Sequence, residues 1–445
     1  MAGELRSTTI GEVCSVFDGP HATPKKTKEG PIFLGITSLK NGHIDLTGVE
    51  HLSEEDFQKW TRRVTPRPGD VVFSYETKLG EAALIPEGLR CCLGRRMALM
   101  RPDPNQADSR FLLYYYLGPE FQDVIRERTI HGSTVDRLAL IEFPKFPLNL
   151  PPLAEQKRIA DILGSLDDKI ELNRRMNETL EGMARALFQS WFVDFDPVRA
   201  KLDGRKPVGL DAETAALFPA AFQDSPLGPI PEGWEVKPLS EITAVITKGT
   251  TPTQGDMARA SDAEVQINYI RVNSIDEEGS ILGDKLTKIP ETVHFGVLKR
   301  SILQANDVLY TIAGTIGRIA ITEEWLLPAN TNQAVAIIRP KATIPPGFLA
   351  LAMRHEVFRN ELHSNIVHAV QANLSLGMLA KARVVVPPDA KLHDIFKPIG
   401  NILSMMNANR IQSRTLAALR DALLPKLLSG ELRVGEVSGE ISERQ

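Results

Sequence analysis

An internal duplication restricts the fold of this chain more than any other feature of its sequence. The two halves of the 445 residues align at an offset of about 236 residues, and Gly19 stands opposite Gly249 near the start of the alignment. β-rich runs that end at Gly80 and Gly317, each followed by a helix-like block, predict the same mixed α/β domain in each half. The matched blocks are 10–24 with 239–253, 33–44 with 269–281, 68–84 with 305–321, 93–102 with 331–340, and 111–125 with 348–362.

Each half closes on a double proline, Pro151-Pro152 and Pro387-Pro388, and about forty residues with heptad spacing follow. Such stretches predict long helices with an apolar seam. One polar seam position recurs as Asn in both stretches. Because a buried amide fixes register, this favours a helix pair over two separate amphipathic surface helices. The predicted seam residues are Ile159, Leu166, Asn173, Leu180 and Leu187 in the first stretch, and Ile395, Ile402, Asn409, Leu416 and Leu423 in the second.

These patterns predict an α+β (mixed) fold, in which two duplicated α/β domains are joined by two long antiparallel coiled-coil helices with pseudo-twofold symmetry. Forty helical residues span roughly 60 Å, on the order of 18 base pairs of duplex DNA. The segment between the halves is rich in proline, glycine and charge, which predicts a linker with about one helical turn. The predicted bounds are a first domain 1–150, a central helix 151–195, a linker 196–229, a second domain 230–388, a C-terminal helix 389–433 and a flexible tail 434–445.

The composition is that of an ordinary soluble globular protein, with 42% apolar and 24% charged residues. The sequence has no run of roughly 18 apolar residues and no apolar segment near Met1, so we expect no membrane span and a cytoplasmic location. Three cysteines are too few for a disulfide framework. Cys91 and Cys92 are predicted to be buried small side chains beside a strand, in preference to a redox pair.

A search for catalytic signatures finds none. The sequence lacks GxxxxGK[ST], GxGxxG, HExxH, CxxC and GxSxG, and it lacks the Asp/Asn-Pro-Pro-Tyr motif of amino-methyltransferases. The acidic run that starts at Ser53 is typical of a helix N-cap followed by an acidic first turn. We therefore expect no catalytic site, no metal and no cofactor on this chain.

Matching loops of the two halves carry cationic and amide side chains suited to DNA. Arginine pairs bidentately with guanine, and asparagine or glutamine with adenine, whereas lysine suits phosphates. Any one of these side chains can equally be a solvated loop residue. The net charge of −4 is evidence against a nucleic-acid binder, unless cations cluster on one face or a partner supplies phosphate contacts. The candidates are Lys25, Lys26, Lys28, Lys78, Arg95 and Arg96 in the first half, and Lys248, Thr250, Thr251, Asn273, Arg318, Asn332 and Gln333 in the second.

Two segments carry a resemblance to a known family. Residues 151–200 begin PPLAEQKRIADIL, and residues 225–242 read SPLGPIPEGWEVKPLSEI. Together they resemble the specificity subunits of type I restriction-modification systems, over essentially the whole chain. In the family's loop before the last strand of each domain, the matching residues are His131, Ser133 and Thr134 in the first domain, and Gln371 and Asn373 in the second.

The resemblance implies that each domain is a target-recognition domain that reads one half of a split double-stranded DNA site, while the helices fix the unspecified spacer. It also implies two methyltransferase (modification) subunits that dock on the helices and bring S-adenosylmethionine, and two nuclease/translocase (restriction) subunits that use ATP and Mg²⁺. The second helix departs from the family pattern, because it begins PPDAKLHD and contains Pro398. That proline is expected to shorten or kink the helix and so to make partner docking unequal.

Two other functions remain open at this point. The chain can be the specificity subunit of a type IIB or IIG-like restriction enzyme, which uses the same domains beside a different partner. It can also be a coiled-coil scaffold unrelated to DNA, which predicts no salt-dependent affinity for DNA in the assembled complex.

Overall fold

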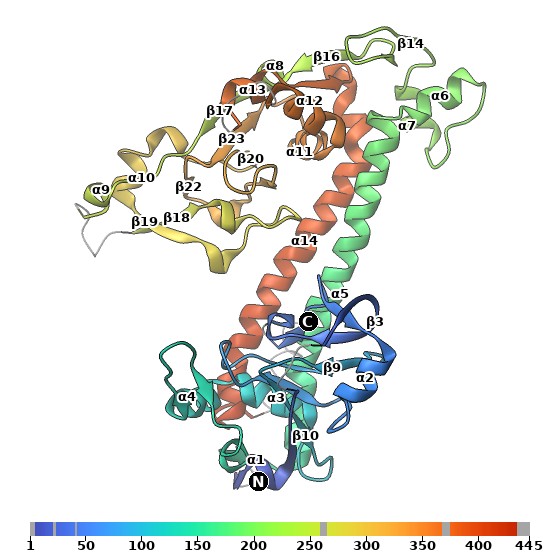
Figure 1. Ribbon diagram of the computed structural model, residues 1–445. Coiled ribbons are helices and arrows are strands. Elements are labelled where there is room, and N and C mark those ends of the chain that lie inside the picture. Colours follow the sequence, from blue (N-terminus) through green and yellow to red (C-terminus); the bar gives the residue numbers. More distant parts are fainter. Residues whose placement is uncertain (1–4, 21–23, 41, 259–264, 367–373, 434–445) are drawn as a thin grey trace. The chain divides into compact units, whose positions relative to one another are not determined.

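The computed structural model describes residues 5–20, 24–40, 42–258, 265–366 and 374–433. The chain folds into two compact units, which are described separately here. Unit 1 comprises residues 1–174 and 410–445, and unit 2 comprises residues 175–409. Each unit contains half of each of two 40-residue helices, α5 (Leu153–Phe192) and α14 (Asp389–Leu428), which run through Figure 1 as the longest ribbons.

Unit 1 is built on a four-stranded antiparallel sheet in the order β2-β10-β7-β8. A second sheet has the order β6-β3-β9, in which β3 and β9 are parallel. The strands are β1 (Arg6–Thr9), β2 (Cys14–Asp18), β3 (Lys26–Leu34), β4 (Leu39–Lys40), β5 (His43–Ile44), β6 (Glu50–Leu52), β7 (Val71–Ser74), β8 (Ala82–Leu84), β9 (Cys91–Leu93), β10 (Met97–Pro102), β11 (Thr129–Ile130), β12 (Arg137–Leu138) and β13 (Pro147–Leu150). The helices are α1 (Ile10–Val13), α2 (Glu54–Trp60), α3 (Ser109–Leu117) and α4 (Pro119–Glu127), with short 3₁₀ turns at η1 (Ile36–Ser38) and η2 (Phe143–Lys145).

The core of unit 1 forms because its central strands and α3 are apolar on nearly every face. All four residues of β7 are buried, and α3 buries six consecutive side chains of its sequence SRFLLYYYL. Asp108 starts α3 by accepting hydrogen bonds from two backbone N–H groups of the first turn. Ser53 caps α2 in the same way, as the sequence predicted. Cys91 and Cys92 are 1% and 0% exposed, which confirms them as buried small side chains.

Unit 2 repeats the two larger sheets of unit 1 in the same strand order. Its main sheet has the order β17-β23-β20-β21, and its second sheet has the order β19-β18-β22 with one parallel pair. The duplication predicted from sequence is therefore confirmed at the level of topology. The strands are β16 (Glu235–Pro238), β17 (Thr243–Lys248), β18 (Gln266–Ile270), β19 (Thr287–Pro290), β20 (Val308–Thr311), β21 (Ile319–Ile321), β22 (Ala329–Thr331), β23 (Val335–Pro340) and β24 (Arg383–Val386). The helices are α8 (Leu239–Ile242), α9 (Gln254–Ala258), α10 (Glu291–Phe295), α11 (Pro346–Arg354), α12 (Glu356–Ile366) and α13 (Leu376–Lys381), and the 3₁₀ turns are η3 (Val272–Ser274), η4 (Gly283–Lys285), η5 (Lys299–Ser301) and η6 (Glu324–Leu326).

A buried ion pair occupies the same place in each unit. Asp70, 2% exposed, accepts two hydrogen bonds from Arg101 at 2.8 and 2.7 Å, and Asp307, 0% exposed, accepts two from Arg339 at 2.7 and 2.8 Å. The aspartate lies in the turn before β7 or β20, and the arginine lies on β10 or β23. Each bidentate pair thus ties the start of one central strand to its neighbour.

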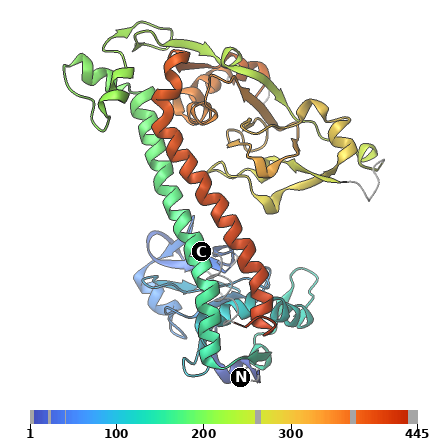
Figure 2. The same ribbon diagram turned by 180° about the vertical axis from the view of Figure 1, so that it is seen from behind.

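The two long helices pack side by side and antiparallel within each unit (Figures 1 and 2). In unit 1, Asn173 Nδ2 donates to Gln412 Oε1 at 2.9 Å and to Ser413 Oγ at 3.2 Å. In unit 2, Asn409 Nδ2 donates to Asn177 Oδ1 at 2.9 Å. All ten predicted seam residues are buried or half-buried. A helix pair with an amide at the predicted seam position is therefore confirmed, and separate surface helices are excluded.

The second long helix is not shortened by its prolines. α14 continues as one helix from Asp389 to Leu428 through Pro398 and Pro425. The carbonyl left without an intrahelical donor by Pro398 belongs to Asp394, which is exposed and can bind water instead. The predicted shortening at Pro398 is wrong, although the helix ends before the predicted residue 433. Residues 434–445, predicted as a flexible tail, lie outside the described residues.

The segment predicted as a linker is folded and packed onto unit 2. It contains α6 (Asp196–Leu202) and α7 (Ala212–Leu217) instead of a single helical turn, and β14 (Phe222–Gln223) pairs with β15 (Ile230–Pro231). Val198 and Phe218 are buried in one cluster with Trp191 and Trp234. Apolar residues between its prolines and glycines hold the segment in place. The overall composition of the segment does not reveal them.

Gln156, the glutamine of the PPLAEQ run, joins α5 to the entry of α3. It is 1% exposed; its Oε1 accepts from Asp108 N at 3.0 Å, and its Nε2 donates to Gln106 O at 3.2 Å and Pro151 O at 2.9 Å. The equivalent position in unit 2 is Leu392, which is fully buried. The departure from the PPLAEQ form in the second half therefore replaces a hydrogen-bond hub by an apolar contact.

Replacing Gln156 with leucine, the residue that unit 2 uses, is expected to lower the free energy of unfolding by about 1–2 kcal/mol. The leucine buries apolar surface, but three backbone groups lose their partner. Urea denaturation of the full chain measures the change. The matched control is Lys157→Ala on the exposed face of α5, which should alter stability by less than about 0.5 kcal/mol. Equal stability of the two variants would show that the hub contributes nothing.

Candidate nucleic-acid interface

Several loops of unit 1 emerge at one end of its main sheet. In the strand register Ala98 lies opposite Asp18, and Met97 lies opposite Ser74. The segments after β2, after β7 and before β10 therefore leave the sheet together. Residues 131–138 join them, because Thr77 N donates to Asp136 O at 3.2 Å and Leu138 N donates to Tyr75 O at 2.9 Å. We call residues 19–20, 75–81, 94–96 and 131–138 the loop edge of unit 1.

Arg95 and Arg96 lie on this loop edge but differ in role. Arg95 is exposed, and no acidic side chain pairs with it among the described residues. Arg96 has a φ of 73° and is half-buried; it contacts Glu76 at 2.9 Å and Thr77 Oγ1 at 3.0 Å. Arg96 therefore braces the β7–β8 loop, whereas Arg95 is available to a ligand. Burial and the Asp18 carboxylate raise the pKa of Tyr75, and the charge of Arg95 opposes that rise.

The remaining candidates of unit 1 fall in two groups. His131, Ser133, Thr134 and the half-buried Lys78 lie on the loop edge, and His131 Nδ1 is 3.2 Å from Asp136. Lys25, Lys26 and Lys28 are exposed at the start of β3, in the second sheet, and Lys26 pairs with Glu50. β3 belongs to the sheet β6-β3-β9, so these three lysines lie on a different sheet from the one that carries the loop edge.

Unit 2 has an equivalent loop edge, made of residues 248–251, 312–318 and 332–334. Gly249 N donates to Val335 O at 3.3 Å, Thr250 N to Thr331 O at 3.2 Å, and Ile312 N to Ala334 O at 2.8 Å. The Thr251 hydroxyl donates to Gln333 Oε1. The backbone bonds hold the segments together, and exposed side chains project from them. Among these exposed side chains are the predicted candidates Lys248, Thr250, Thr251 and Gln333.

Two candidates of unit 2 form hydrogen bonds within the protein, and a third lies on η3, outside the loop edge. Asn332 Oδ1 accepts from Ala334 N at 3.2 Å, so its side chain stabilises its own turn. Arg318 is half-buried, donates to Ile275 O at 2.7 Å and lies 3.7 Å from Glu277, so it braces the loop after η3. Asn273 is exposed on η3 itself. Gln371 and Asn373 lie outside the described residues.

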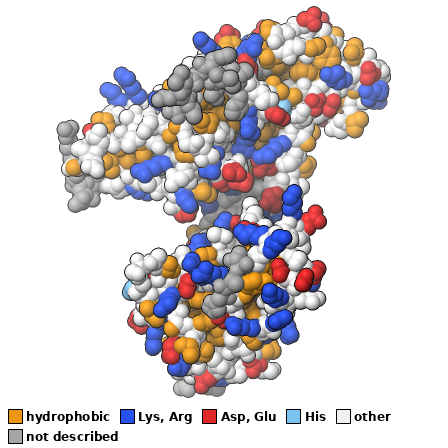
Figure 3. All heavy atoms as spheres, viewed as in Figure 1, with side chains coloured by type: hydrophobic (Ala, Val, Ile, Leu, Met, Phe, Trp, Pro, Cys, Tyr) orange, Lys and Arg blue, Asp and Glu red, His pale blue; other side chains and the backbone are white. Residues whose placement is uncertain are grey.

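Exposed cationic side chains are present in both units (Figure 3) although the net charge of the chain is −4. On the face seen in Figure 3, Lys and Arg side chains are interspersed with Asp and Glu in both units. Sequence reasoning missed two cationic pairs, Arg62-Arg63 and Lys299-Arg300, which occupy equivalent positions of the duplicated halves. A residue-by-residue alignment of the halves through Asp70 and Asp307 contains the signal that identifies them.

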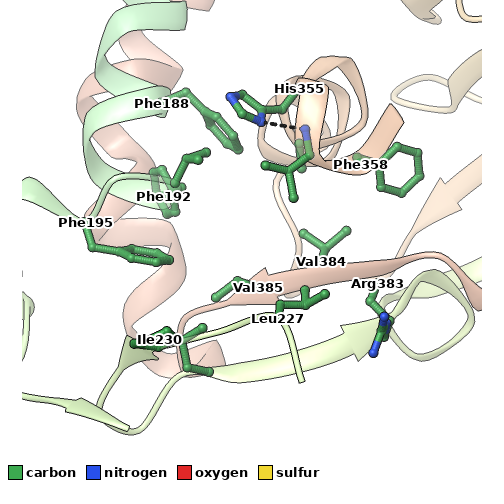
Figure 4. A pocket seen from close by; sticks show the side chains of 14 residues that line it. Phe188, Phe192, Phe195, Leu227, Ile230, His355, Phe358, Arg383, Val384 and Val385 are labelled. Atoms are coloured by element: carbon green, nitrogen blue, oxygen red, sulfur yellow. Dashed lines mark hydrogen bonds between the residues drawn. The ribbon is translucent and has the colours of Figure 1, made fainter. Parts of the chain in front are cut away.

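An apolar pocket of about 130 Å³ lies in unit 2 between the end of α5, residues 227–230, α12 and β24 (Figure 4). His355 on its wall accepts from Val357 N through Nδ1 at 3.2 Å, and its Nε2 contacts Gln189 Oε1. Burial lowers the pKa of His355, which favours the neutral ring. Arg383, also on the wall, is paired with Glu361 at 2.7 Å. The two titratable side chains of the lining thus each have a partner outside it, Gln189 for His355 and Glu361 for Arg383.

The described residues offer no group of three or more His, Cys, Asp or Glu side chains able to hold a metal ion. Within the same residues, neither long helix nor any shorter one has an apolar stretch sufficient to cross a bilayer.

Comparison with known proteins decides the family. A model of the type I restriction modification DNA specificity domain matches twice, at residues 4–182 and 231–414, and so covers most of the chain. The chain belongs to the type I restriction-modification specificity family. The first match ends within α5 and the second within α14, so each copy of the specificity domain comprises one mixed α/β domain and the greater part of the long helix that follows it. The type IIB/IIG-like and scaffold alternatives are not favoured.

Relatives in the specificity family are similar along most of their length. The HindI specificity subunit of Haemophilus influenzae is 26% identical over 76% of this chain and 80% of its own. The putative MjaX specificity subunit of Methanocaldococcus jannaschii is 29% identical over 94% of this chain and 91% of its own. The crystal structure of the type I S subunit from M. genitalium aligns with a TM-score of 0.56 at 14% identity and covers 96% of both chains, which shows a shared fold.

Proposed function

We propose that this chain reads a bipartite DNA sequence, with one half-site for each recognition domain. One observation carries the proposal: two domains of identical topology present loop edges at the same end of the main sheet, and the side chains on these edges differ. Unit 1 presents Arg95 where unit 2 presents Gln333 and Thr251. Arginine suits guanine and glutamine suits adenine, so the two edges are suited to different bases.

The proposal extends to partner subunits. Methyltransferase subunits would dock on the helix pair and bring S-adenosylmethionine, and nuclease/translocase subunits would bring ATP and Mg²⁺, which leaves this chain without catalysis of its own. Six large apolar side chains stay exposed on the helices, where a docking subunit would bury them. They are Leu172, Ile411 and Leu419 in unit 1, and Met176, Met183 and Met405 in unit 2.

DNA footprinting of the chain assembled with its methyltransferase partner tests the proposal. We expect two short protected blocks separated by an unprotected or sequence-indifferent spacer, and an affinity that falls steeply with salt. One continuous protected sequence, or none, would contradict a bipartite reader. The same experiment with the chain alone should show weaker binding, because its net charge is −4 and partner subunits are expected to supply phosphate contacts.

Inserting one extra heptad into both long helices is expected to lengthen the spacer by about 3 base pairs, because seven helical residues add about 10 Å. The insertions belong after Arg174 in α5 and after Asn409 in α14, at the sequence boundaries of the two units, so that every contact within a unit is kept. The recognised half-sites should not change. Sequencing the methylated sites measures the spacer, and an unaltered spacer would show that the helices do not set it.

A further inference from the structure

In each unit, a pair of adjacent cationic residues follows a short helix, which is α2 in unit 1 and α10 in unit 2. Arg62 and Arg63 follow α2, and Lys299 and Arg300 form the start of η5 after α10. Arg63 and Arg300 each stand seven residues before the buried aspartate of their unit. The two pairs therefore occupy equivalent positions. On the loop edges, by contrast, the side chains differ between the units.

The same framework holds both pairs in place. Arg101 Nη2, besides binding Asp70, donates to Thr65 O at 3.0 Å. Arg339 Nη2 likewise donates to Ile302 O at 3.4 Å. Each accepting carbonyl lies two residues after the cationic pair, so the buried ion pair anchors the backbone that carries the cations. A cation on an anchored backbone loses less entropy when it binds a ligand than one on a free loop.

Acidic side chains of the protein neutralise these four cations only to a small extent. Arg62, Lys299 and Arg300 are exposed, and no carboxylate pairs with them among the described residues. Arg63 is 70% exposed in its side chain and lies 3.9 Å from Asp18, a separation at the limit of an ion pair. Exposed pairs of this kind contribute little to stability. The fold therefore keeps two cationic positions that it does not use for its own cohesion.

Both pairs lie beside the edge strand that leads to the loop edge. In unit 1, Arg62 and Arg63 line a hollow of about 410 Å³ together with Gly19, Pro20, Lys59, Trp60 and others. In unit 2, η5 lies against β17, the strand that ends at the exposed Lys248. A ligand that touches the loop edge thus passes next to the pair.

We propose that Arg62-Arg63 and Lys299-Arg300 are the DNA phosphate anchors of the two domains, one pair for each half-site. The proposal rests on the proposed DNA-reading function and deepens it. Two anchored cations next to exposed base-reading side chains suit two backbone phosphates that flank the bases being read. Because phosphates are the same in every sequence, one pair can be kept in both domains while the readers diverge. These anchors position the DNA and do not select bases.

The test uses the chain assembled with its methyltransferase subunits. Arg62→Gln/Arg63→Gln and Lys299→Gln/Arg300→Gln are compared with the wild type in binding to target and non-target duplexes over a range of salt. Each double variant should reduce the slope of log K against log salt by about 2 and weaken binding roughly 10–30-fold near 0.15 M salt, equally for both duplexes. The charge-retaining variant Arg62→Lys/Arg63→Lys should keep most of the wild-type affinity.

A control variant removes one exposed cation at the opposite end of each main sheet. Lys145 lies in η2 beside α1, and Lys341 N donates to the carbonyl of Ile242, which directly precedes β17. Lys145→Gln/Lys341→Gln should leave the salt slope unchanged. Circular dichroism establishes that every variant is folded.

Three outcomes would overturn the anchors. An unchanged salt slope would show that the pairs do not touch phosphate. An altered methylation motif would show that they read bases. Loss of assembly with intact DNA affinity would show that they contact a protein partner. In each case a wild-type complex that still protects a bipartite site leaves the proposed function standing, whereas a wild type without such protection refutes that function separately.

Discussion

Replacing Asp307 with alanine is expected to lower the free energy of unfolding of unit 2 by about 3–5 kcal/mol, the largest stability effect that we predict for a single substitution. Asp307 is 0% exposed and binds Arg339 through both oxygens, and its Oδ2 also accepts from Gln304 N at 2.8 Å. Alanine leaves the Arg339 guanidinium with no carboxylate and frees the turn before β20. Urea denaturation of the full chain, followed by tryptophan fluorescence, measures the loss.

The equivalent substitution in unit 1 tests the corresponding aspartate–arginine ion pair. Asp70 binds Arg101 and accepts from Arg67 N at 2.8 Å, so Asp70→Ala should cost about as much as Asp307→Ala. The double variant Asp307→Ala/Arg339→Leu should recover part of the loss, because no uncompensated charge then remains. A double variant as unstable as the single one would show that the loss comes from the turn and not from the stranded arginine.

Replacing Arg95 with alanine is expected to relax base recognition in one half-site and to cost about 1–3 kcal/mol of affinity for the original target, up to roughly a hundredfold. Arg95 is the exposed arginine of the unit 1 loop edge, and Arg96 beside it is held by Glu76 and Thr77. Competition between duplexes that differ in one half-site at a time measures the change.

Two further variants sharpen the test of Arg95. Gln333→Ala, on the loop edge of unit 2, should affect the other half-site and leave the first one intact. Arg96→Ala should lower the stability of the β7–β8 loop as well as the affinity, because it removes an internal contact. A uniform loss of affinity over both half-sites after Arg95→Ala would contradict its assignment as a base reader.

The parts of the fold that follow from local sequence patterns were predictable. Heptad spacing is set by the geometry of a single helix, so the seam through Asn173 and Asn409 could be read from the residues. The duplicated domains followed from the alignment of the two halves. Their loop edges followed in part, because the Gly19 and Gly249 turns end strands that the sequence already indicated.

The parts that depend on which distant residues meet were not predictable. Asp70 and Arg101 are 31 residues apart in the sequence, and Gln156 is 48 residues from Asp108. No local pattern marks partners that are this far apart. Arg318 and Asn332 were predicted as base readers, but their side chains also hold neighbouring backbone in place. A cationic or amide side chain on a loop suits either role, and only its neighbours in space distinguish the two.

The central claim is that one chain specifies two half-sites, and methylome sequencing tests it most directly. The chain would be expressed with its methyltransferase partner in a host that lacks adenine methylation, and new methylated sites would be mapped across the genome. We predict one motif of two short specified sequences separated by a spacer of fixed length, with a methylated adenine in each half-site. A single uninterrupted motif, a spacer of varying length, or no new methylation would contradict the claim.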